Sequence, residues 1–206
     1  MQDFTTFFFI LICASVFYVY LENKASDVTY VSLNNIEFLV RNLPDKEEAA
    51  LLLSKIRERL TNIVEHSCKK MIEDKKEEEK LDETKKIHNA SLKRLKKNFR
   101  PNNITESSPG NKYTSYSINK GDKIVFCLRS KDGNNKLVDI NTMMFVAIHE
   151  LGHLMTKSIG HTTEFWDNMR FLLKKGIEIG VYVKQDFNSI PVDYCGTKIT
   201  DTPLNN

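Results

Sequence analysis

The sequence predicts an α+β fold, in which a small antiparallel sheet and several helices lie behind an N-terminal transmembrane helix. Three observations predict it: an uncharged apolar segment at residues 4–21, two pairs of short alternating segments joined by turn-forming residues, and apolar residues at helical spacing. The chain of 206 residues leaves enough length for one domain after the apolar segment. We therefore expect a membrane anchor at residues 1–24 and one folded domain at residues 25–206.

The segment from Phe4 to Leu21 predicts a single membrane span. Its 18 positions carry no charge, and as a helix they would reach about 27 Å, close to the thickness of a hydrocarbon core. Asp3 precedes it without any basic residue, and the bulky Tyr18 and Tyr20 fill its end, which favours an uncleaved anchor over a cleaved signal peptide or a buried helix. Because basic residues follow the span and none precedes it, we expect the folded domain on the cytosolic side.

The first part of the domain is expected to form a hairpin and a long helix. Residues 28–33 and 36–41 alternate as strands do, and Asn34-Asn35 between them suits a tight turn. Pro44-Asp45 precedes an expected helix from Lys46 to about Lys70, whose apolar residues fall on one stripe.

Residues 69–112 are expected to be a charged helix and a loop within the domain. Basic and acidic residues are interspersed from Lys69 to Arg100, which describes a solvated helix with ion pairs between successive turns. The basic amphipathic end at residues 92–100 is more simply a surface helix than a phosphate-binding face. Binding of nucleic acid or anionic lipid stays open, and the net charge of +3 requires neither.

A second hairpin and two further helices follow in the sequence. Residues 113–118 and 123–128 flank a turn at Asn119-Lys120-Gly121-Asp122. The apolar run at residues 140–148, with Asp139 or Asn141 as N-cap, begins a helix. That helix would end near Gly160, taken as a C-cap glycine, and Thr162 or Thr163 would cap the next one.

The first of these helices carries the sequence His149-Glu150-Leu151-Gly152-His153. Histidines four residues apart project from one helical face and can share a tetrahedral Zn²⁺, and Glu150 can then act as general base toward a water molecule. His161 would complete three protein ligands and leave one position open, as in a catalytic site. In a chain with five histidines, an HExxH motif can also arise by chance. The interpretation therefore depends on the predicted elements around the motif as well.

The sequence leaves alternatives open for the residues around the metal. Glu178, Glu164 or Asp167 could replace His161 as third ligand, although Glu164 is more simply a first-turn acid at a helix N-terminus. Asp167, Glu178 or Asp193 could orient a ligating histidine through its second ring nitrogen.

A hydrogen-bond donor for the charge that develops on the substrate must also be found. The candidates are Tyr113, Tyr116, Tyr182, Tyr194 and Arg129. We favour Tyr194, because it lies in the turn-rich segment 193–196 after the last helix.

Residues 149–173, HELGHLMTKSIGHTTEFWDNMRFLL, resemble the zinc metallopeptidases of the WLM and SprT-like group, in which HExxH is followed by Gly-His and an aromatic pair. The loop between the second and third histidines is longer than is usual in that group. Residues 28–204 are similar to membrane-anchored metallopeptidases of large nucleocytoplasmic DNA viruses. The matching segments are residues 40–46, 112–117, 123–129 and 193–196. The resemblance implies a viral single-pass protein with a WLM/SprT-like domain. For such a protein, the side expected from the basic residues is the cytosolic or virion-interior side.

Together these observations predict a zincin-like zinc metalloendopeptidase that hydrolyses polypeptides at a membrane. His149, His153 and His161 would bind Zn²⁺, Glu150 would activate the water, and Tyr194 would assist. The strand before the HExxH helix is either a core strand or a free edge that holds an extended peptide. The competing classes are a non-enzymatic membrane or virion protein with a structural zinc site, and a basic nucleic-acid-binding or lipid-binding module.

The cysteines predict a chain without a disulfide framework. Cys13 lies in the expected span, which leaves Cys68, Cys127 and Cys195, an odd number without a CxxC pair. This usage is typical of a reducing compartment.

Overall fold

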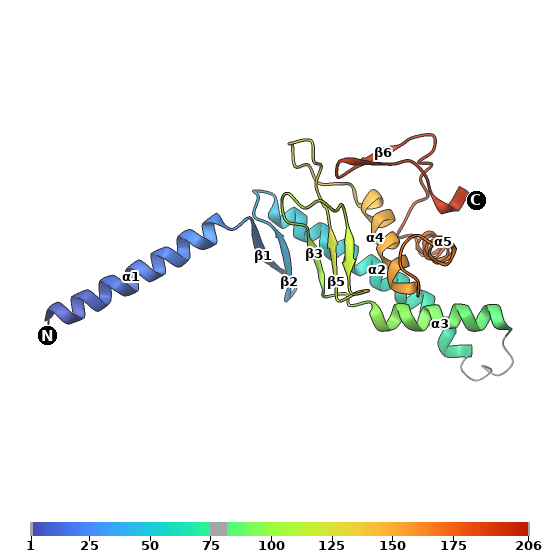
Figure 1. Cartoon of the computed structure of the whole chain (residues 1–206), viewed down its shortest axis with the longest axis horizontal. Coiled ribbons are helices and arrows are strands. Elements are labelled where there is room, and N and C mark those ends of the chain that lie inside the picture. Colours follow the sequence, from blue (N-terminus) through green and yellow to red (C-terminus); the bar gives the residue numbers. More distant parts are fainter. Residues whose placement is uncertain (1, 75–81, 206) are drawn as a thin grey trace.

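The computed structural model describes residues 2–74 and 82–205, and within them the fold is α+β (Figure 1). The described helices and strands form three small sheets around a group of helices. In chain order they are α1 (Gln2–Ala25), β1 (Val28–Leu33), β2 (Ile36–Arg41), α2 (Lys46–Asp74), α3 (Glu83–Asn98), β3 (Ile104–Glu106), β4 (Tyr116–Ile118), β5 (Lys123–Phe126), α4 (Ile140–Met155), α5 (Thr163–Glu178), β6 (Val192–Tyr194), β7 (Thr197–Ile199) and the short 3₁₀ helix η2 (Pro203–Asn205).

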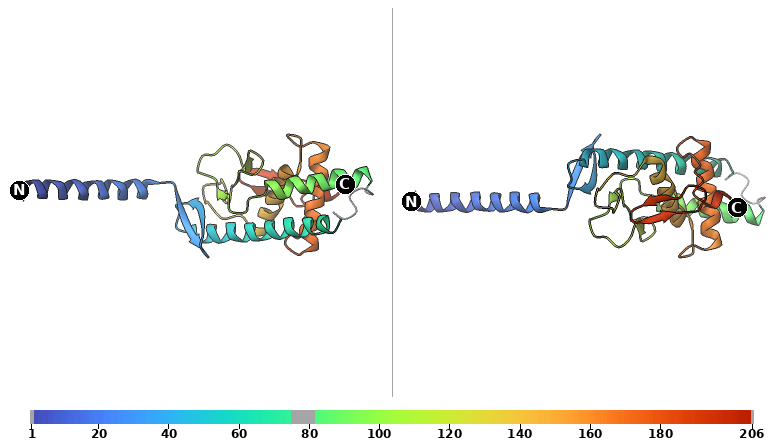
Figure 2. Two further views of the ribbon diagram at one scale, coloured as in Figure 1. Left: turned by 90° about the horizontal axis from the view of Figure 1, so that it is seen from below. Right: turned by 90° about the horizontal axis from the view of Figure 1, so that it is seen from above.

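Helix α1 extends away from the rest of the chain in every view (Figures 1 and 2). Among the described residues, no helix has both the length and the apolar character that crossing a membrane requires. The prediction of a single-pass membrane protein is therefore wrong for the part of the chain that the structure describes.

The expected hairpin and long helix at the start of the domain are confirmed. β1 pairs with β2 in antiparallel register from Val28↔Arg41 to Leu33↔Ile36. Asn34 and Asn35 have φ angles of 51° and 62°, the left-handed backbone that a two-residue hairpin turn requires. Helix α2 buries one apolar stripe completely, so its amphipathic pattern does predict its packing. The members of that stripe include Ala49, Leu53, Ile56, Leu60 and Ile63.

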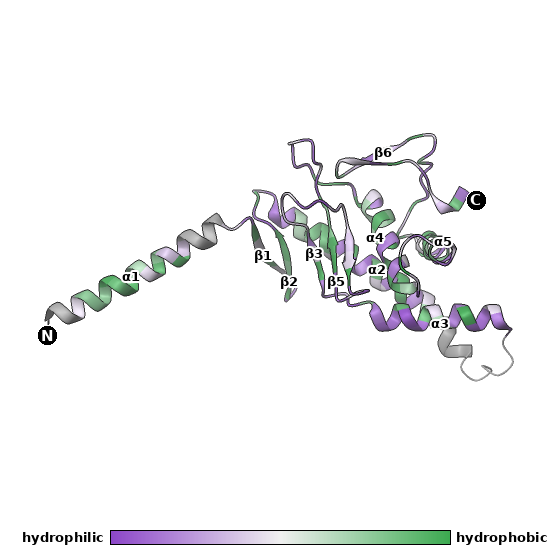
Figure 3. Ribbon diagram, viewed as in Figure 1, coloured by the Kyte–Doolittle hydropathy of each residue, from purple (hydrophilic) through white to green (hydrophobic). Residues whose placement is uncertain are grey.

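Helix α3 confirms the surface-helix interpretation of the charged segment. It begins after Asp82, whose side chain accepts a hydrogen bond from the Lys85 amide, and it buries Leu92 and Leu95. Most of its residues are hydrophilic (Figure 3). The earlier part of this predicted charged helix includes residues 75–81, which lie outside the described residues.

The central sheet has the order β3-β5-β4, which leaves β4 at an edge. β4 and β5 form the expected antiparallel hairpin, with Tyr116 opposite Val125. β3, however, pairs in parallel with β5, so this sheet is mixed where the sequence predicts a small antiparallel sheet. Its three residues lie in a segment that the sequence predicts to be a loop, because so short a strand has no periodicity to detect.

The C-terminal hairpin β6–β7 folds back onto the end of β5, where a disulfide joins Cys127 to Cys195. The prediction that the chain lacks disulfides is therefore wrong. The two cysteines are 68 residues apart, and only the tertiary fold brings them together. Cys68 is a buried free thiol and Cys13 an exposed one.

Helix α4 lies at the centre of the domain and contacts α2, α3, α5 and β4. Most of its residues are buried, in keeping with its apolar composition. This central position fixes the orientation of the HExxH residues that α4 carries (Figure 1).

Candidate metal centre

Helix α4 presents His149 and His153 side by side. The helix begins after Asp139, whose carboxylate accepts hydrogen bonds of 2.9 Å from the amides of Asn141 and Thr142. Asp139 is therefore the N-cap, one of the two predicted candidates. The four-residue spacing places the two histidines one turn apart, and their Nε2 atoms are 3.2 Å from each other.

His161 reaches the same point from the loop between α4 and α5. Helix α4 ends at Met155 with Thr156 as its C-cap, so the prediction of Gly160 as the C-cap is wrong. Gly160 instead has a φ of 84° within the loop, a conformation that glycine adopts without strain. The loop turns back there, and His161 Nε2 lies 3.1 Å from His149 Nε2.

The three imidazoles fit a tetrahedral metal ion. Nitrogen ligands at the usual zinc distance of about 2.0–2.1 Å would be separated from one another by about 3.3 Å, and the two nitrogen separations from His149 are 3.1 and 3.2 Å. All three ligand atoms lie within 4.8 Å of one another. In the described parts of the chain, this is the one group of three potential ligand side chains gathered closely enough to hold a metal.

The carboxylates that the sequence offered as alternatives lie elsewhere. Glu178 and Asp167 form ion pairs on their own helix at 2.6 and 2.7 Å, and the Asp193 side chain is 83% exposed. Glu164 accepts hydrogen bonds from the backbone of the loop before His161. The structure therefore brings His161, and none of these carboxylates, to the other two histidines.

Phe165 supports the histidine cluster from within the core. Its ring is fully buried, stacks on His153 at 4.4 Å and contacts the rings of His149 and His161 at 4.9 and 4.8 Å. Gly152 makes room for it, since a Cβ at that position would lie 3.0 Å from the Phe165 ring. Gly152 thus admits an aromatic ring that contacts all three imidazoles.

The electrostatic surroundings keep His149 and His153 neutral. Burial, together with the neighbouring His153 and His161, lowers the pKa of His149 to about 3. Burial, His161 and Lys120 lower the pKa of His153 to about 4. A metal ion binds the neutral form of imidazole. Near pH 7, His149 and His153 can therefore bind a metal without first releasing a proton.

Glu150 is a buried carboxylate beside this cluster. Its side chain is 4% exposed, and burial raises its pKa to about 7. Across the described residues, no hydrogen bond or ion pair engages the carboxylate. A buried acid without a partner and with a pKa near neutrality is suited to accept and release a proton.

A cleft of about 520 Å³ opens in front of the cluster. The edge strand β4 and its turn form one wall, and α4 with the His161 loop forms the other. Its lining residues are Thr114, Ser115, Tyr116, Ser117, Asn119, Lys120, His149, Glu150, His153, Ser158, Ile159, Gly160 and His161.

Tyr194 lies behind this cleft and contacts it through Ser115. Its hydroxyl is 2.6 Å from Ser115 Oγ and donates to the Cys127 carbonyl at 3.0 Å. Burial raises the pKa of Tyr194 above its ordinary value, and the charge of Glu150 contributes in the same direction. The hydroxyl is therefore protonated near pH 7, and its role as an oxyanion donor stays a prediction.

The other candidate donors are distributed around the domain. Tyr116 lines the cleft, whereas Tyr113 and Tyr182 do not. Arg129 is held by two carboxylates at 2.8 and 2.6 Å. Sequence reasoning missed Ser115, because nothing distinguishes this serine from its neighbours before the hairpin is folded.

The shifted pKa values predict how the metal-free protein responds to acid. Below pH 6.5 the unfolded chain protonates His149 and His153, while the folded chain keeps them neutral to about pH 3 and 4. Glu150 has the opposite effect on stability. Its pKa is raised from 4.5 to about 7 in the folded state, so the folded state binds this proton at a higher pH than the unfolded chain does. Two histidines outweigh one carboxylate, so the stability should fall between pH 6.5 and 4.5.

Urea unfolding of the metal-free protein at several pH values measures this response. Glu150→Gln removes the opposing group and should make the loss on acidification steeper than in the unmodified protein. An unchanged pH dependence in that variant would contradict the assignment of a raised pKa to Glu150.

Comparison with known proteins gives the family of the chain. The model of the WLM domain matches residues 65–203, a region that contains the histidine cluster and both walls of the cleft. That family is associated with metallopeptidase-like hydrolases and with dependence on a metal. No solved structure matches the chain.

The similar proteins are viral. An uncharacterised protein of Acanthamoeba polyphaga mimivirus is 34% identical over 197 residues, which cover 95% of this chain and 93% of that protein. Uncharacterised proteins of Invertebrate iridescent viruses 6 and 3 are 33% and 38% identical over about a third of this chain, and the matched regions cover 38% and 42% of those proteins. The domain match and the nearly full-length viral relative agree, and the chain therefore belongs to the WLM domain family.

Proposed function

We propose that this protein is a zinc-dependent endopeptidase that hydrolyses extended segments of polypeptide. The observation that carries the proposal is the position of Glu150, a buried carboxylate with a pKa of about 7, next to three converging imidazoles in an open cleft. A site that only stabilised the fold would need neither the unpartnered acid nor the access.

His149, His153 and His161 would hold the metal through their Nε2 atoms. A bound Zn²⁺ would polarise the substrate carbonyl and lower the pKa of a water molecule. Imidazole ligands carry no negative charge, so they would leave the ion its full positive charge for this purpose, and the buried Phe165 contacts all three rings.

Glu150 would move the proton in both halves of the reaction. Its carboxylate would accept a proton from the water that attacks the carbonyl carbon. The same oxygen would then deliver that proton to the amine nitrogen as the C–N bond breaks. A pKa of about 7 suits both transfers, because neither direction is strongly uphill near neutral pH.

The edge strand β4 supports an extended polypeptide as the substrate. β4 is last in the order β3-β5-β4, so within the described residues one side of it has no strand partner. Tyr116 and Ser117 of this strand line the cleft. An extended peptide could add to such an edge through backbone hydrogen bonds, which recognise any sequence and place its carbonyl groups beside the histidines.

The full chain, loaded with one equivalent of Zn²⁺, tests the proposal on an unfolded protein such as carboxymethylated casein. We expect internal cleavage fragments in the mass spectrum, their loss on chelation, and their return when zinc is restored. His161→Ala should be inactive under the same conditions. Stoichiometric zinc binding without any fragments, in the presence or absence of single-stranded and duplex DNA, would contradict the proposal and favour a structural metal site.

A further inference from the structure

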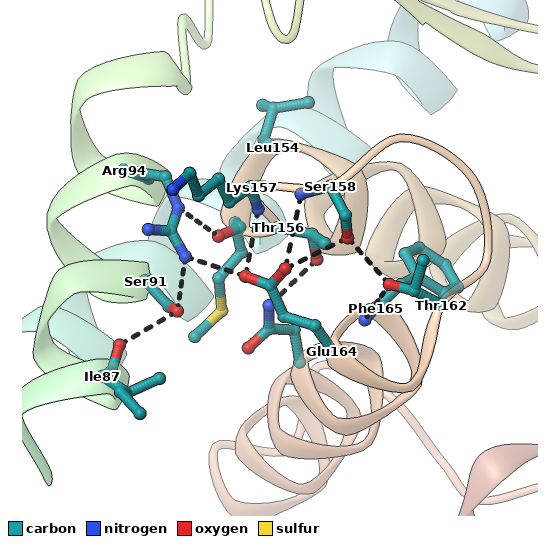
Figure 4. A network of polar contacts seen from close by, with 12 residues as sticks. Ile87, Ser91, Arg94, Leu154, Thr156, Lys157, Ser158, Thr162, Glu164 and Phe165 are labelled. Carbon is teal, nitrogen blue, oxygen red and sulfur yellow. Dashed lines mark hydrogen bonds and ion pairs between the residues drawn. The ribbon is translucent and has the colours of Figure 1, made fainter. Parts of the chain in front are cut away.

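The segment from Leu154 to Ser158 leaves helix α4 and leads to the third histidine. Helices end with carbonyl groups that have no partner within the helix. Here the carbonyls and amides of this segment are bonded by side chains from three other places in the fold. These are helix α3 and the first turn of α5 (Figure 4), and the β4–β5 turn. The segment is therefore held from several directions at the point where it approaches the metal centre.

Lys120 holds the segment from the β4–β5 turn. Its ammonium donates hydrogen bonds to the carbonyl oxygens of Thr156, Lys157 and Ser158 at 2.7, 2.7 and 3.0 Å. All three donors of this ammonium group are therefore used on one stretch of backbone. The turn is itself fixed, because Gly121 packs so closely on the Asn98 carbonyl that a Cβ there would lie 2.1 Å from the oxygen.

Glu164 holds the same segment from helix α5. Its carboxylate accepts hydrogen bonds from the amides of Lys157 and Ser158 at 3.0 and 3.3 Å and from Ser158 Oγ at 3.1 Å (Figure 4). Burial alone would raise the pKa of Glu164, but these hydrogen bonds and the charge of Arg94 lower it below its ordinary value. The carboxylate is thus ionised and accepts several hydrogen bonds at once.

Helix α3 supplies the third set of contacts. Arg94 donates through Nε to the Met155 carbonyl at 3.0 Å and through Nη2 to Glu164 at 2.9 Å. Asn98, one turn further on, donates to the Leu154 carbonyl at 3.0 Å. Part of the basic segment of α3 therefore forms hydrogen bonds with the end of the HExxH helix instead of facing solvent.

Burial in the core holds little of the loop that follows. Ile159, Gly160 and His161 are all exposed, and Ile159 has 91% of its surface accessible. The loop is instead closed by a hydrogen bond of 2.8 Å between Ser158 Oγ and Thr162 Oγ1. The His161 ring packs on Phe165, but no side chain of residues 159–161 is buried, so the hydrogen bonds at the base of the loop hold its backbone in place.

We infer that Lys120, Glu164 and Arg94 are positioning residues, which set the affinity of the centre for its metal by holding the base of the loop that carries His161. Their hydrogen bonds reach residues 155–158 rather than a ligand nitrogen, so we expect them to act through this segment. The inference rests on the metal centre of the proposed function, but it does not depend on peptidase activity.

Zinc affinity measured by competition with a chromophoric chelator tests the inference. Lys120→Met keeps most of the side-chain volume and removes the three hydrogen bonds. We expect it to weaken zinc binding by about 10-fold or more, the loss typical of residues that orient metal ligands. Lys123→Met, in the same hairpin and with the same change of charge, should bind zinc as the unmodified protein does, because its ammonium has no partner among the described residues.

A double-mutant cycle with His161→Ala separates positioning from general stability. If Lys120 acts through His161, then Lys120→Met should change the zinc affinity by less than about two-fold once His161 is alanine. Equal losses in both backgrounds, or no loss in either, would overturn the inference. If His161→Ala bound zinc as tightly as the unmodified protein, the metal centre itself would be contradicted. If the protein lacked peptidase activity, the zinc affinities of the cycle would still test the inference.

Glu164→Gln provides an independent variant for the same cycle, should Lys120→Met not fold. It keeps the shape of the side chain and one acceptor, but it loses the second acceptor and the charge that pairs with Arg94. We expect the same pattern, a loss of zinc affinity that disappears in the His161→Ala background. A loss that persists there would assign Glu164 to general stability and overturn its part in positioning.

Discussion

Glu150→Gln should lower the turnover of the zinc-loaded protein by about 10²- to 10⁴-fold, which is the usual contribution of a general acid–base residue. Glutamine fills the same volume but cannot accept the proton from water or deliver it to the leaving amine. The zinc affinity should stay unchanged, because Glu150 is not among the residues that gather at the metal position. Initial rates on an unfolded protein, together with the zinc content of each preparation, give both quantities.

Glu58→Gln is the matched control. Glu58 is an exposed residue of helix α2 and does not line the cleft. It should leave both the rate and the zinc content as they are in the unmodified protein. If Glu150→Gln retained its full rate with zinc bound, the water would be activated by another group and the proposed mechanism would be wrong.

Reduction of the Cys127–Cys195 disulfide should lower the free energy of unfolding by about 4 kcal/mol, since the bond closes a loop of 68 residues and so removes much of the freedom of the unfolded chain. Reduction is also expected to disturb the cleft, because the hairpin that carries Cys195 also carries Tyr194, whose hydroxyl is hydrogen-bonded to Ser115. Urea unfolding with and without reductant measures the change.

The double variant Cys127→Ser, Cys195→Ser should be destabilised in the same way and should no longer respond to reductant. Cys13→Ser, which alters an exposed free thiol, should behave as the unmodified protein. A difference below about 1 kcal/mol between the oxidised and reduced forms would show that the β6–β7 hairpin is held by its packing and not by the disulfide.

Local chemistry was sufficient to predict much of the fold. The left-handed Asn34-Asn35 turn, the amphipathic stripe of α2 and the caps Asp139 and Thr162 depend on neighbouring residues alone. The same is true of His149 and His153, whose spacing determines that they share a helical face.

The remaining features depend on contacts between distant segments. The parallel strand β3 and the Cys127–Cys195 bond arise only when the chain has folded. The length of the loop before His161 made its role uncertain in the sequence, and Lys120, Arg94 and Glu164 carry no motif that marks them. They acquire their positions because the turn, α3 and α5 meet at the end of α4.

The X-ray absorption spectrum of the zinc-loaded full chain at the zinc edge tests the central claim most directly, because it reports the ligands of the metal. Three histidine nitrogens at about 2.0–2.1 Å and one exchangeable oxygen ligand are expected, with one nitrogen fewer in His161→Ala. This result would describe an open centre that can admit a substrate. Four protein ligands, or any sulfur at about 2.3 Å, would describe a closed structural site and contradict the account.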